Sequence, residues 1–146
     1  MLATFFGIGL LPWCPGTWGA LAGLVLGILL KDAPLAIVMT VLFCAGVWVS
    51  QKTAEAVGNK DPSEVVIDEV VGMGVAMLFL PRTLFFCIAA FALFRLFDIW
   101  KPGVIRRFES AGGGLGIMLD DLAAGIFANL ILQSGHLIYL LAHMRK

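Results

Sequence analysis

Residues 62–81 read PSEVVIDEVVGMGVAMLFLP, an apolar stretch between two prolines that carries the adjacent acids Asp68 and Glu69. Proline is accepted in the first turn of a helix but disrupts its interior, so the stretch predicts one helix that begins at Pro62 and is stopped by Pro81. A carboxylate at the centre of a bilayer costs on the order of 2.5 to 3.5 kcal/mol, so acids within such a helix need a group that neutralises them. The stretch therefore predicts a membrane helix that carries part of a functional site.

The composition places this helix in an integral membrane protein. Hydrophobic residues make up 60% of the 146 residues and charged residues 14%, and the mean hydropathy is +0.97. A soluble domain of this length has too little interior to bury so much apolar surface. The formal net charge is zero, which gives no electrostatic footprint for nucleic acid. The chain shows no internal repeat, so we expect residues 1–146 to form a single membrane domain.

Helix start and stop signals predict four further helices. Capping residues, prolines and glycines set their bounds at about residues 17–30, 32–57, 83–101 and 117–141. Residues 2–11 predict a re-entrant or interfacial segment. We therefore expect an all-α fold, a polytopic membrane helical bundle of about five helices plus this short N-terminal segment. Within the third helix, Gly72 and Gly74 predict close packing against a neighbouring helix.

Alternating helices would bring the acids to one side of the membrane. Asp98 lies near the end of the fourth helix, and Asp120 with Asp121 near the start of the fifth, so all three face the same side as Asp68 and Glu69. That side also holds Lys52, Lys60, Lys101, Arg106 and Arg107, against Lys31, Arg82, Arg145 and Lys146 on the other. By the positive-inside rule this distribution favours the cytoplasmic side for the acids. Tryptophans that commonly form an interfacial belt fall at the same boundary: Trp13, Trp18 and Trp100.

The acids form two adjacent pairs, Asp68 with Glu69 and Asp120 with Asp121. Adjacent side chains on a helix point about 100° apart, so one member of each pair can bind a metal while its neighbour orients water or a second metal. Oxygen ligands suit the hard cation Mg²⁺ better than zinc, and no cluster of His and Cys competes with them. The alternative is that one acid of each pair caps a helix or meets lipid headgroups.

Cationic and amide groups near the acids predict a binding site for phosphate. Arg95, Asp98 and Lys101 recur every third residue and lie near one helix face, either as an intrahelical ion-pair ladder or as part of an anion site. Thr17 stands at the positive end of the first helix. The backbone amides of Gly113 and Gly114 precede the fifth helix, where an anion is also favoured. Glycine loops of this kind also serve turn geometry alone.

Four groups of residues recur in the order and spacing of a known family. They are Gly9, Pro12, Pro15, Gly16, Thr17 and Gly19; Asp68 and Glu69; Arg95, Asp98, Lys101 and Pro102; and Gly113, Gly114, Gly116, Asp120, Asp121 and Gly125. Together they resemble phosphatidylglycerophosphatase A, a family of bacterial Mg²⁺-dependent membrane lipid phosphatases. The resemblance implies hydrolysis of phosphatidylglycerophosphate to phosphatidylglycerol and inorganic phosphate at the bacterial cytoplasmic (inner) membrane, with a product that feeds anionic lipid and cardiolipin.

These observations predict a role for each candidate residue. We expect Asp68, Glu69, Asp120 and Asp121 to bind Mg²⁺. We expect Glu69, Asp98 and Asp121 to act in catalysis, with Asp98 as a further ligand or as general base. Groups expected to bind the substrate phosphate are Thr17, Arg95, Lys101, Gly113 and Gly114. The expected partners are the lipid substrate and the bilayer, and both direct attack by water and a phosphoaspartyl intermediate fit these residues.

Two other functions use similar residues. An ion-coupled transporter also binds cations with acids inside helices, but it needs polar groups along a path to both sides, and the far halves of these helices are nearly all apolar. A lipid-headgroup transferase carries a run of spaced aspartates along one helix, which this chain lacks. The triplet Ser134, Gly135 and His136 superficially matches a metal-independent phosphatase motif but lies away from the acids. A lipid phosphatase fits best, and an ion-coupled transporter is the alternative.

Overall fold

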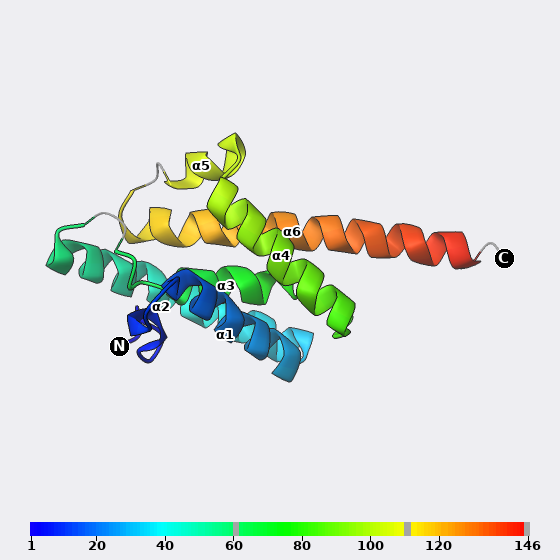
Figure 1. Ribbon diagram of the computed structural model, residues 1–146, viewed down its shortest axis with the longest axis horizontal. Coiled ribbons are helices and arrows are strands. Elements are labelled where there is room, and N and C mark those ends of the chain that lie inside the picture. The colour runs from blue at the N-terminus through cyan, green and yellow to red at the C-terminus, as the bar shows by residue number, and fades with distance from the viewer. Residues whose placement is uncertain (60–61, 110–111, 145–146) are drawn as a thin grey trace.

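The computed structural model describes residues 1–59, 62–109 and 112–144. Within these ranges the chain forms one short 3₁₀ helix and six α-helices and has no β-strand, which confirms the expected all-α fold. The elements are η1 (Ile8–Leu10), α1 (Pro15–Leu29), α2 (Asp32–Val57), α3 (Ile67–Ala76), α4 (Leu84–Trp100), α5 (Gly103–Glu109) and α6 (Gly113–Met144) (Figure 1). Lys60, Arg145 and Lys146, which entered the charge distribution above, lie outside the described residues.

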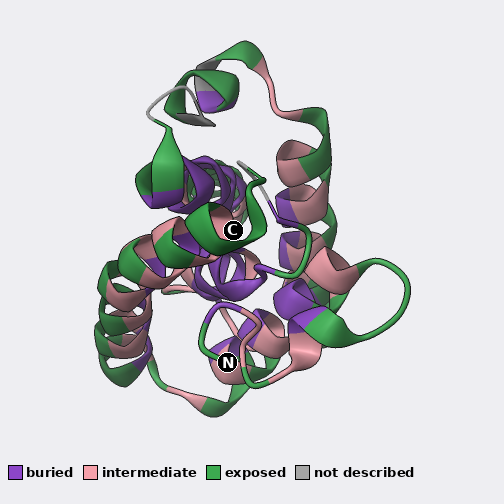
Figure 2. Ribbon diagram, turned by 90° about the vertical axis from the view of Figure 1, so that its left-hand side faces the viewer, coloured by how far each residue is buried: buried purple, intermediate pink, exposed green. Residues whose placement is uncertain are grey.

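Helix α3 lies at the centre of the bundle, with α1, α2, α4 and α6 packed against it (Figure 1, Figure 2). All of its residues are buried except Glu69 and Val75, which are partly exposed. Ten helical residues span about 15 Å, half of a bilayer core of about 30 Å, so α3 alone is too short to cross a membrane. Its apolar side chains are therefore buried by neighbouring helices and not by lipid.

Glycines let the neighbouring helices approach α3 closely. A Cβ added at Gly23 of α1 would lie 2.5 Å from the carbonyl oxygen of Val70, and one added at Gly72 would lie 2.5 Å from that of Asp121 on α6. A Cβ added at Gly74 would overlap a methionine side chain of α2. The predicted close packing at Gly72 and Gly74 is confirmed, and it brings α6 with Asp121 against α3.

The predicted helix over residues 62–81 is wrong at both ends, because tertiary partners decide where α3 begins and stops. The amides of Val66 and Ile67 donate to the carbonyl oxygen of Ala3, at 2.9 and 3.3 Å, so the chain turns against the N-terminal segment before α3 begins. At the other end Phe79 has a left-handed backbone, with φ 60°, and its amide donates to Asp32 Oδ1 at 2.9 Å. Helix α3 therefore lacks the outer turns that the two prolines predict.

The other bounds differ less from expectation. Helix α2 covers the predicted residues 32–57, and residues 1–11 form turns and η1 without a spanning helix. Helix α6 begins at Gly113, four residues before the expected start, because the glycine cluster forms its first turn. The short α5 was not expected from the sequence, and it is anchored by the fully buried side chain of Ile105.

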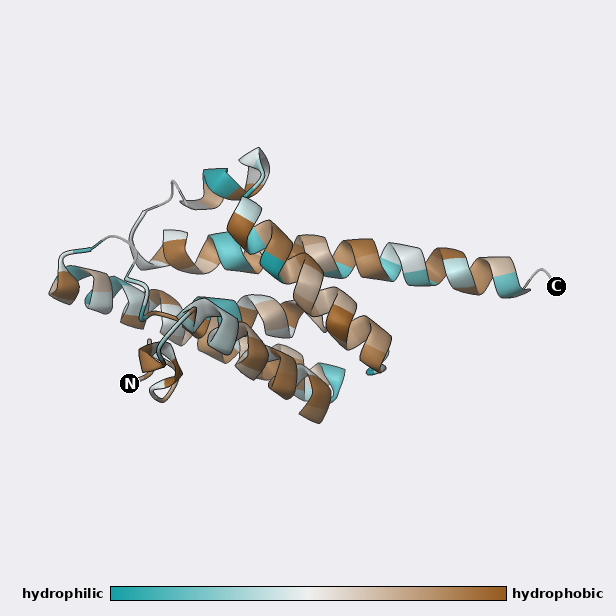
Figure 3. Ribbon diagram, viewed as in Figure 1, coloured by the Kyte–Doolittle hydropathy of each residue, from teal (hydrophilic) through white to brown (hydrophobic). Residues whose placement is uncertain are grey.

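Hydrophobic residues predominate along α1 and α4, whose ribbons are mostly brown in Figure 3, and many apolar side chains of the bundle are exposed. On α2, for example, Ile37, Val41 and Trp48 are all exposed. By length and composition α2 and α6 are able to cross a membrane, and α1 is a shorter apolar helix. Large exposed apolar faces are unfavourable in water, so this exterior indicates a membrane protein.

Side-chain hydrogen bonds connect neighbouring helices at the end of the bundle where α1 and α3 end. Arg82, in the turn after α3, donates to Asp32 Oδ1 at 2.6 Å. The side-chain amide of Asn129 on α6 donates to the carbonyl oxygens of Ala76 and Leu78, at 3.0 and 2.7 Å. These carbonyl groups at the end of α3 have no helical partner, so Asn129 supplies the donors that water would supply elsewhere.

Candidate active site

One cavity of about 310 Å³ opens at the end of the bundle where α1 and α3 begin and α4 ends. Its lining residues are Cys14, Pro15, Gly16, Pro62, Ser63, Val65, Asp68, Glu69, Arg95, Asp98, Ile99, Lys101, Asp120 and Asp121. All five acids singled out from the sequence are among them, together with Arg95 and Lys101. Helices α3, α4 and α6, with Lys101 just after α4, thus bring these charged side chains to a single polar cavity.

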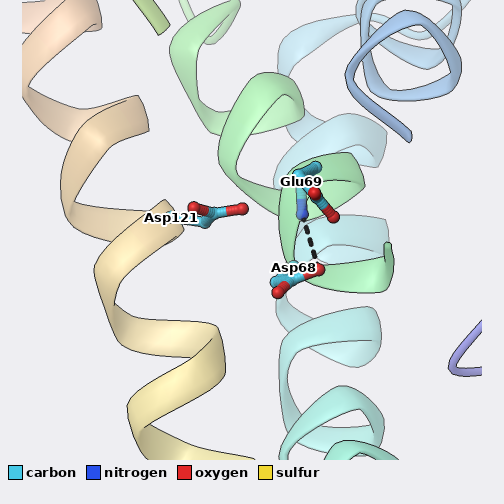
Figure 4. Close-up of side chains that lie close together, drawn as sticks. All are labelled: Asp68, Glu69 and Asp121. Carbon is cyan, nitrogen blue, oxygen red and sulfur yellow. Dashed lines mark hydrogen bonds between the residues drawn. The ribbon is translucent and has the colours of Figure 1, made fainter. Parts of the chain in front are cut away.

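Three carboxylates converge within this cavity (Figure 4). Asp68 and Glu69 come from the first turn of α3, and Asp121 reaches toward them from α6. Ligand oxygens of the three residues all lie within 4.8 Å of one another. Asp68 and Asp121 are only 7% and 4% exposed, so water screens their repulsion poorly. Such a group is stable only when protons or a bound cation reduce its charge.

The two basic side chains of the cavity form ion pairs with the other two acids. Arg95 pairs with Asp98 one turn further along α4, and Lys101 Nζ lies 2.5 Å from Asp120 Oδ2. Among the ion pairs of the described residues, none involves the three converging carboxylates. The ladder considered for α4 is therefore half formed, because Lys101 leaves the helix in a left-handed backbone conformation (φ 43°) and turns toward α6.

The converging carboxylates fit a metal ion. Glu69 Oε2 is buried and has no hydrogen-bond partner among the described residues. A buried carboxylate oxygen without a donor is costly, and a cation beside it would supply the missing partner. The three side chains offer oxygen ligands alone, the set that hard divalent cations prefer. Asp68, Glu69 and Asp121 could therefore hold such an ion.

Local structure explains how adjacent acids meet different partners. Asp68 and Glu69 lie in the first turn of α3, where unpaired backbone amides and the helix dipole favour negative charge. The amide of Glu69 donates to Asp68 Oδ1 at 3.1 Å (Figure 4). Because adjacent residues on a helix point about 100° apart, Asp120 turns toward Lys101 while Asp121 turns toward α3.

Comparison with known proteins identifies the family of this chain. A family model described as phosphatidylglycerophosphatase A matches residues 1–136. The chain belongs to this family. The resemblance carried by the four residue groups of the sequence is thereby confirmed, and no solved structure matches the chain.

Three relatives match over most of their length. The chain is 42% identical over 137 residues to phosphatidylglycerophosphatase A of Haemophilus influenzae, a match that covers 90% of this chain and 84% of the relative. It is 38% identical over 142 residues to phosphatidylglycerophosphatase A of Escherichia coli, covering 93% and 83%. It is also 38% identical over 146 residues to a Bacteroides thetaiotaomicron protein whose name proposes a phosphatidylinositol-3-phosphatase, covering 90% and 89%.

In this member of the phosphatidylglycerophosphatase A family, three expected phosphate ligands do not line the acidic cavity: Thr17, Gly113 and Gly114. The amide of Gly114 donates to Gln51 Oε1 on α2 at 2.7 Å. A Cβ added at Gly113 would overlap the same Gln51 side chain. Gly113 also lines a separate cavity of about 290 Å³ at the end of α2. Both glycines therefore serve the contact between α2 and α6.

Gly16 lines the cavity, although it was not among the expected phosphate ligands. A Cβ at this position would overlap Glu69 Oε1 and would lie 3.3 Å from Arg95 Nη1. A glycine at the start of a helix can be recognised in the sequence. That Gly16 faces Glu69, however, follows only from the packing of α1 against α3. Further lining residues carried no signal in the sequence: Cys14, Ser63 and Ile99.

A larger cavity of about 600 Å³ lies between α4 and the C-terminal half of α6 and shares no residue with the acidic cavity. It is lined by Phe85, Phe86, Ile131, Leu132, Gly135, His136 and Tyr139. His136 packs edge to face against Phe86, with ring centroids 5.1 Å apart. This lining contains no carboxylate, lysine or arginine, whereas the acidic cavity of this phosphatidylglycerophosphatase A family member holds all five acids singled out from the sequence.

Proposed function

We propose that this protein is a lipid phosphatase that hydrolyses phosphatidylglycerophosphate to phosphatidylglycerol and inorganic phosphate. The observation that carries the proposal is the cavity in which three converging carboxylates lie beside Arg95 and Lys101. Membership of the family supports the headgroup, since the relatives from Haemophilus influenzae and Escherichia coli are named for it. We further propose that residues 1–146 form one domain with this function.

Mg²⁺ is the cofactor that we propose for this site. Asp68, Glu69 and Asp121 would hold the ion, because together they offer hard oxygen ligands and negative charge. Asp120, beside this group and paired with Lys101, would orient the outer ligands of the site. Bound there, Mg²⁺ would offset the negative charge of the phosphate oxygens.

The side chains of the cavity would bind and orient the substrate. Arg95 and Lys101 would bind nonbridging oxygens of the phosphate. Asp98 and Asp120 hold these two cations in position. Hydrolysis adds the oxygen of a water molecule to phosphorus and breaks the bond from phosphorus to the glycerol oxygen, which takes up a proton. Asp98, on the cavity wall, would accept the proton that the water gives up.

We propose that the protein is a multi-pass protein of the bacterial cytoplasmic (inner) membrane with the acidic cavity on the cytoplasmic side. Two helices of spanning length support this location. Besides Arg95 inside the cavity, the described basic residues at the cavity end are Lys52, Lys101, Arg106 and Arg107, against Lys31 and Arg82 at the other end. Basic residues favour the cytoplasmic side. The product would enter the pool of anionic lipid from which cardiolipin is made.

Phosphatidylinositol 3-phosphate is a second candidate substrate, because the name of the Bacteroides thetaiotaomicron relative points to it. Both lipids carry a phosphate monoester, and the acids and cations of the cavity would serve either one. An ion-coupled transporter has less support. Its acids should continue as a polar path to the other side, whereas the cavity at the far half of α6 is apolar.

The test is phosphate release by the purified protein in detergent micelles, with Mg²⁺ and with a chelator in its place. The substrates are phosphatidylglycerophosphate, phosphatidylinositol 3-phosphate, phosphatidic acid and a soluble phosphomonoester. We expect release that requires Mg²⁺ and is fastest from phosphatidylglycerophosphate. Preference for the inositol lipid would reassign the substrate. No release from any compound by the folded protein would contradict a phosphatase and favour ion transport.

A further inference from the structure

The mouth of the acidic cavity is partly apolar. Cys14, the residue before α1, and Ile99, in the last turn of α4, both line the cavity and are both exposed. Ile99 is 72% exposed, whereas Asp68 and Asp121 on the cavity floor are buried. Ser63, in the loop before α3, is the third exposed residue of the lining. The cavity therefore runs from an exposed rim, apolar at Ile99 and weakly polar at Cys14, to a buried charged floor formed by α3 and α6.

Two tryptophans flank this mouth. Trp13 precedes Cys14 and is 90% exposed, and Trp100 follows Ile99 and is 67% exposed. Tryptophan is enriched where hydrocarbon meets the headgroups of a bilayer, because its ring is apolar and its N–H group is polar. Two exposed tryptophans beside one opening are the arrangement that is typical of headgroup depth, where the phosphate of a lipid lies.

The backbone at the mouth is held in an uncommon conformation. Trp13, Cys14 and Lys101 all have positive φ angles, of 65°, 53° and 43°. The left-handed region is unfavourable for residues that carry a side chain, and such residues cluster at ligand sites whose surroundings fix them. Cys14 and Lys101 line the cavity and Trp13 immediately precedes Cys14, so packing holds the backbone around this opening in conformations that these residues would not prefer alone.

We propose that this mouth admits a diacyl lipid from the bilayer, and that Trp13, Ile99 and Trp100 select a lipid-borne phosphate monoester over a water-soluble one. The proposal rests on the proposed lipid phosphatase function. The phosphate reaches the charged floor, the glycerol passes between Cys14 and Ile99, and the acyl chains stay in the bilayer beside the tryptophans. A soluble phosphate ester has no apolar part that could contact this rim, so it gains no binding energy from it.

The first test compares a lipid with a soluble substrate in variants of the rim. Trp13→Ala combined with Trp100→Ala, and Ile99→Ser separately, should raise the apparent KM for phosphatidylglycerophosphate in mixed micelles roughly tenfold and leave kcat within about twofold. Hydrolysis of a water-soluble phosphomonoester without acyl chains should not change. Trp48→Ala is the matched control, because Trp48 is 66% exposed on α2 and does not line the cavity. Equal losses for both substrates, or no loss for the lipid, would overturn the proposal.

A second measurement needs no turnover. In a Cys44→Ser variant Cys14 is the remaining exposed thiol, since Cys87 is buried, so its alkylation by a maleimide reports on the mouth. Micelles that contain a phosphonate analogue of phosphatidylglycerophosphate should slow this labelling, and phosphatidylcholine micelles should not. Protection without hydrolysis would retain the mouth as a lipid entrance while contradicting the phosphatase. Hydrolysis without protection would retain the phosphatase and refute the entrance.

Discussion

At the scale of single residues, Asp121 joins a carboxylate from α6 to the two acids of α3. We predict that Asp121→Asn lowers kcat/KM for phosphatidylglycerophosphate on the order of 10²-fold or more, because the site loses a ligand for the ion. The same change should leave the metal-free protein at least as stable as wild type, since it removes one of three mutually repelling charges. Turnover assays and thermal unfolding with and without Mg²⁺ measure both effects.

The matched control for Asp121 is Glu55→Gln. Glu55 is an exposed acid of α2 that pairs with Lys52 and does not line the cavity. This variant should keep nearly normal turnover and gain the same stabilisation from Mg²⁺ as wild type. If Asp121→Asn also kept normal turnover, Asp121 would have no part in metal binding.

Gly16 tests how closely α1 must approach the acids. We predict that Gly16→Ala lowers kcat/KM about 10- to 100-fold, because the added methyl group would overlap Glu69 Oε1 and displace that carboxylate. Gly135→Ala is the control, since nothing lies within 4 Å of an added Cβ there. It should keep full activity and raise the unfolding midpoint slightly, because alanine favours a helix by about 1 kcal/mol over glycine. Full activity of Gly16→Ala would show that Glu69 tolerates displacement.

At the scale of elements, the C-terminal end of α3 is capped by hydrogen bonds from a side chain of α6. Asn129→Leu keeps a similar volume but leaves the carbonyl oxygens of Ala76 and Leu78 without their donor. We predict a loss of about 1–3 kcal/mol in the free energy of unfolding, the cost of an unsatisfied buried polar group. Gln133→Leu should cost less, because it removes a 2.6 Å hydrogen bond to Asn129 Oδ1 and a weak one of 3.5 Å to Leu78 but leaves both bonds from Asn129 to α3 in place. Denaturant unfolding of both variants compares the two, and equal losses would rule out the cap.

Helix bounds follow from the sequence where the signals are local, and not where distant residues decide them. The bounds of α2 were predicted residue for residue, from capping positions next to the helix itself. The start of α3 depends on Ala3, and its end on Asp32, which is 47 residues from Phe79. Proline positions could not reveal these partners. The same limit explains α5, because Ile105 is the one buried side chain among those described in this helix and sets no periodic pattern.

The chemistry of the candidate site could be predicted from the sequence, but its geometry could not. Alternating helices place all five acids at one end, where the structure finds them. Which acid of an adjacent pair faces the cluster depends on the rotation of α6 about its axis, and that rotation is set by its packing against α3 at Gly72. Hence Asp121 joins the cluster and Asp120 pairs with Lys101.

At the scale of the whole molecule, charge is concentrated at one end of an apolar bundle. The acidic cavity occupies that end, whereas Arg82 and Asp32 at the other end pair with each other at 2.6 Å. The cavity between α4 and the far half of α6 is apolar. This distribution suits an enzyme that acts on headgroups at one membrane face, since ion transport needs polar groups that lead to both.

The same asymmetry predicts a topology. In a variant without exposed native thiols, Cys14→Ser with Cys44→Ser, we place single cysteines at Asn59 near the cavity end and at Lys31 at the opposite end, both exposed positions. Because basic residues favour the cytoplasm, a membrane-impermeant maleimide should label Lys31→Cys in intact spheroplasts and Asn59→Cys only in inverted vesicles. The reverse pattern would put the acidic cavity on the outer face, where the enzyme would meet its lipid in the other leaflet.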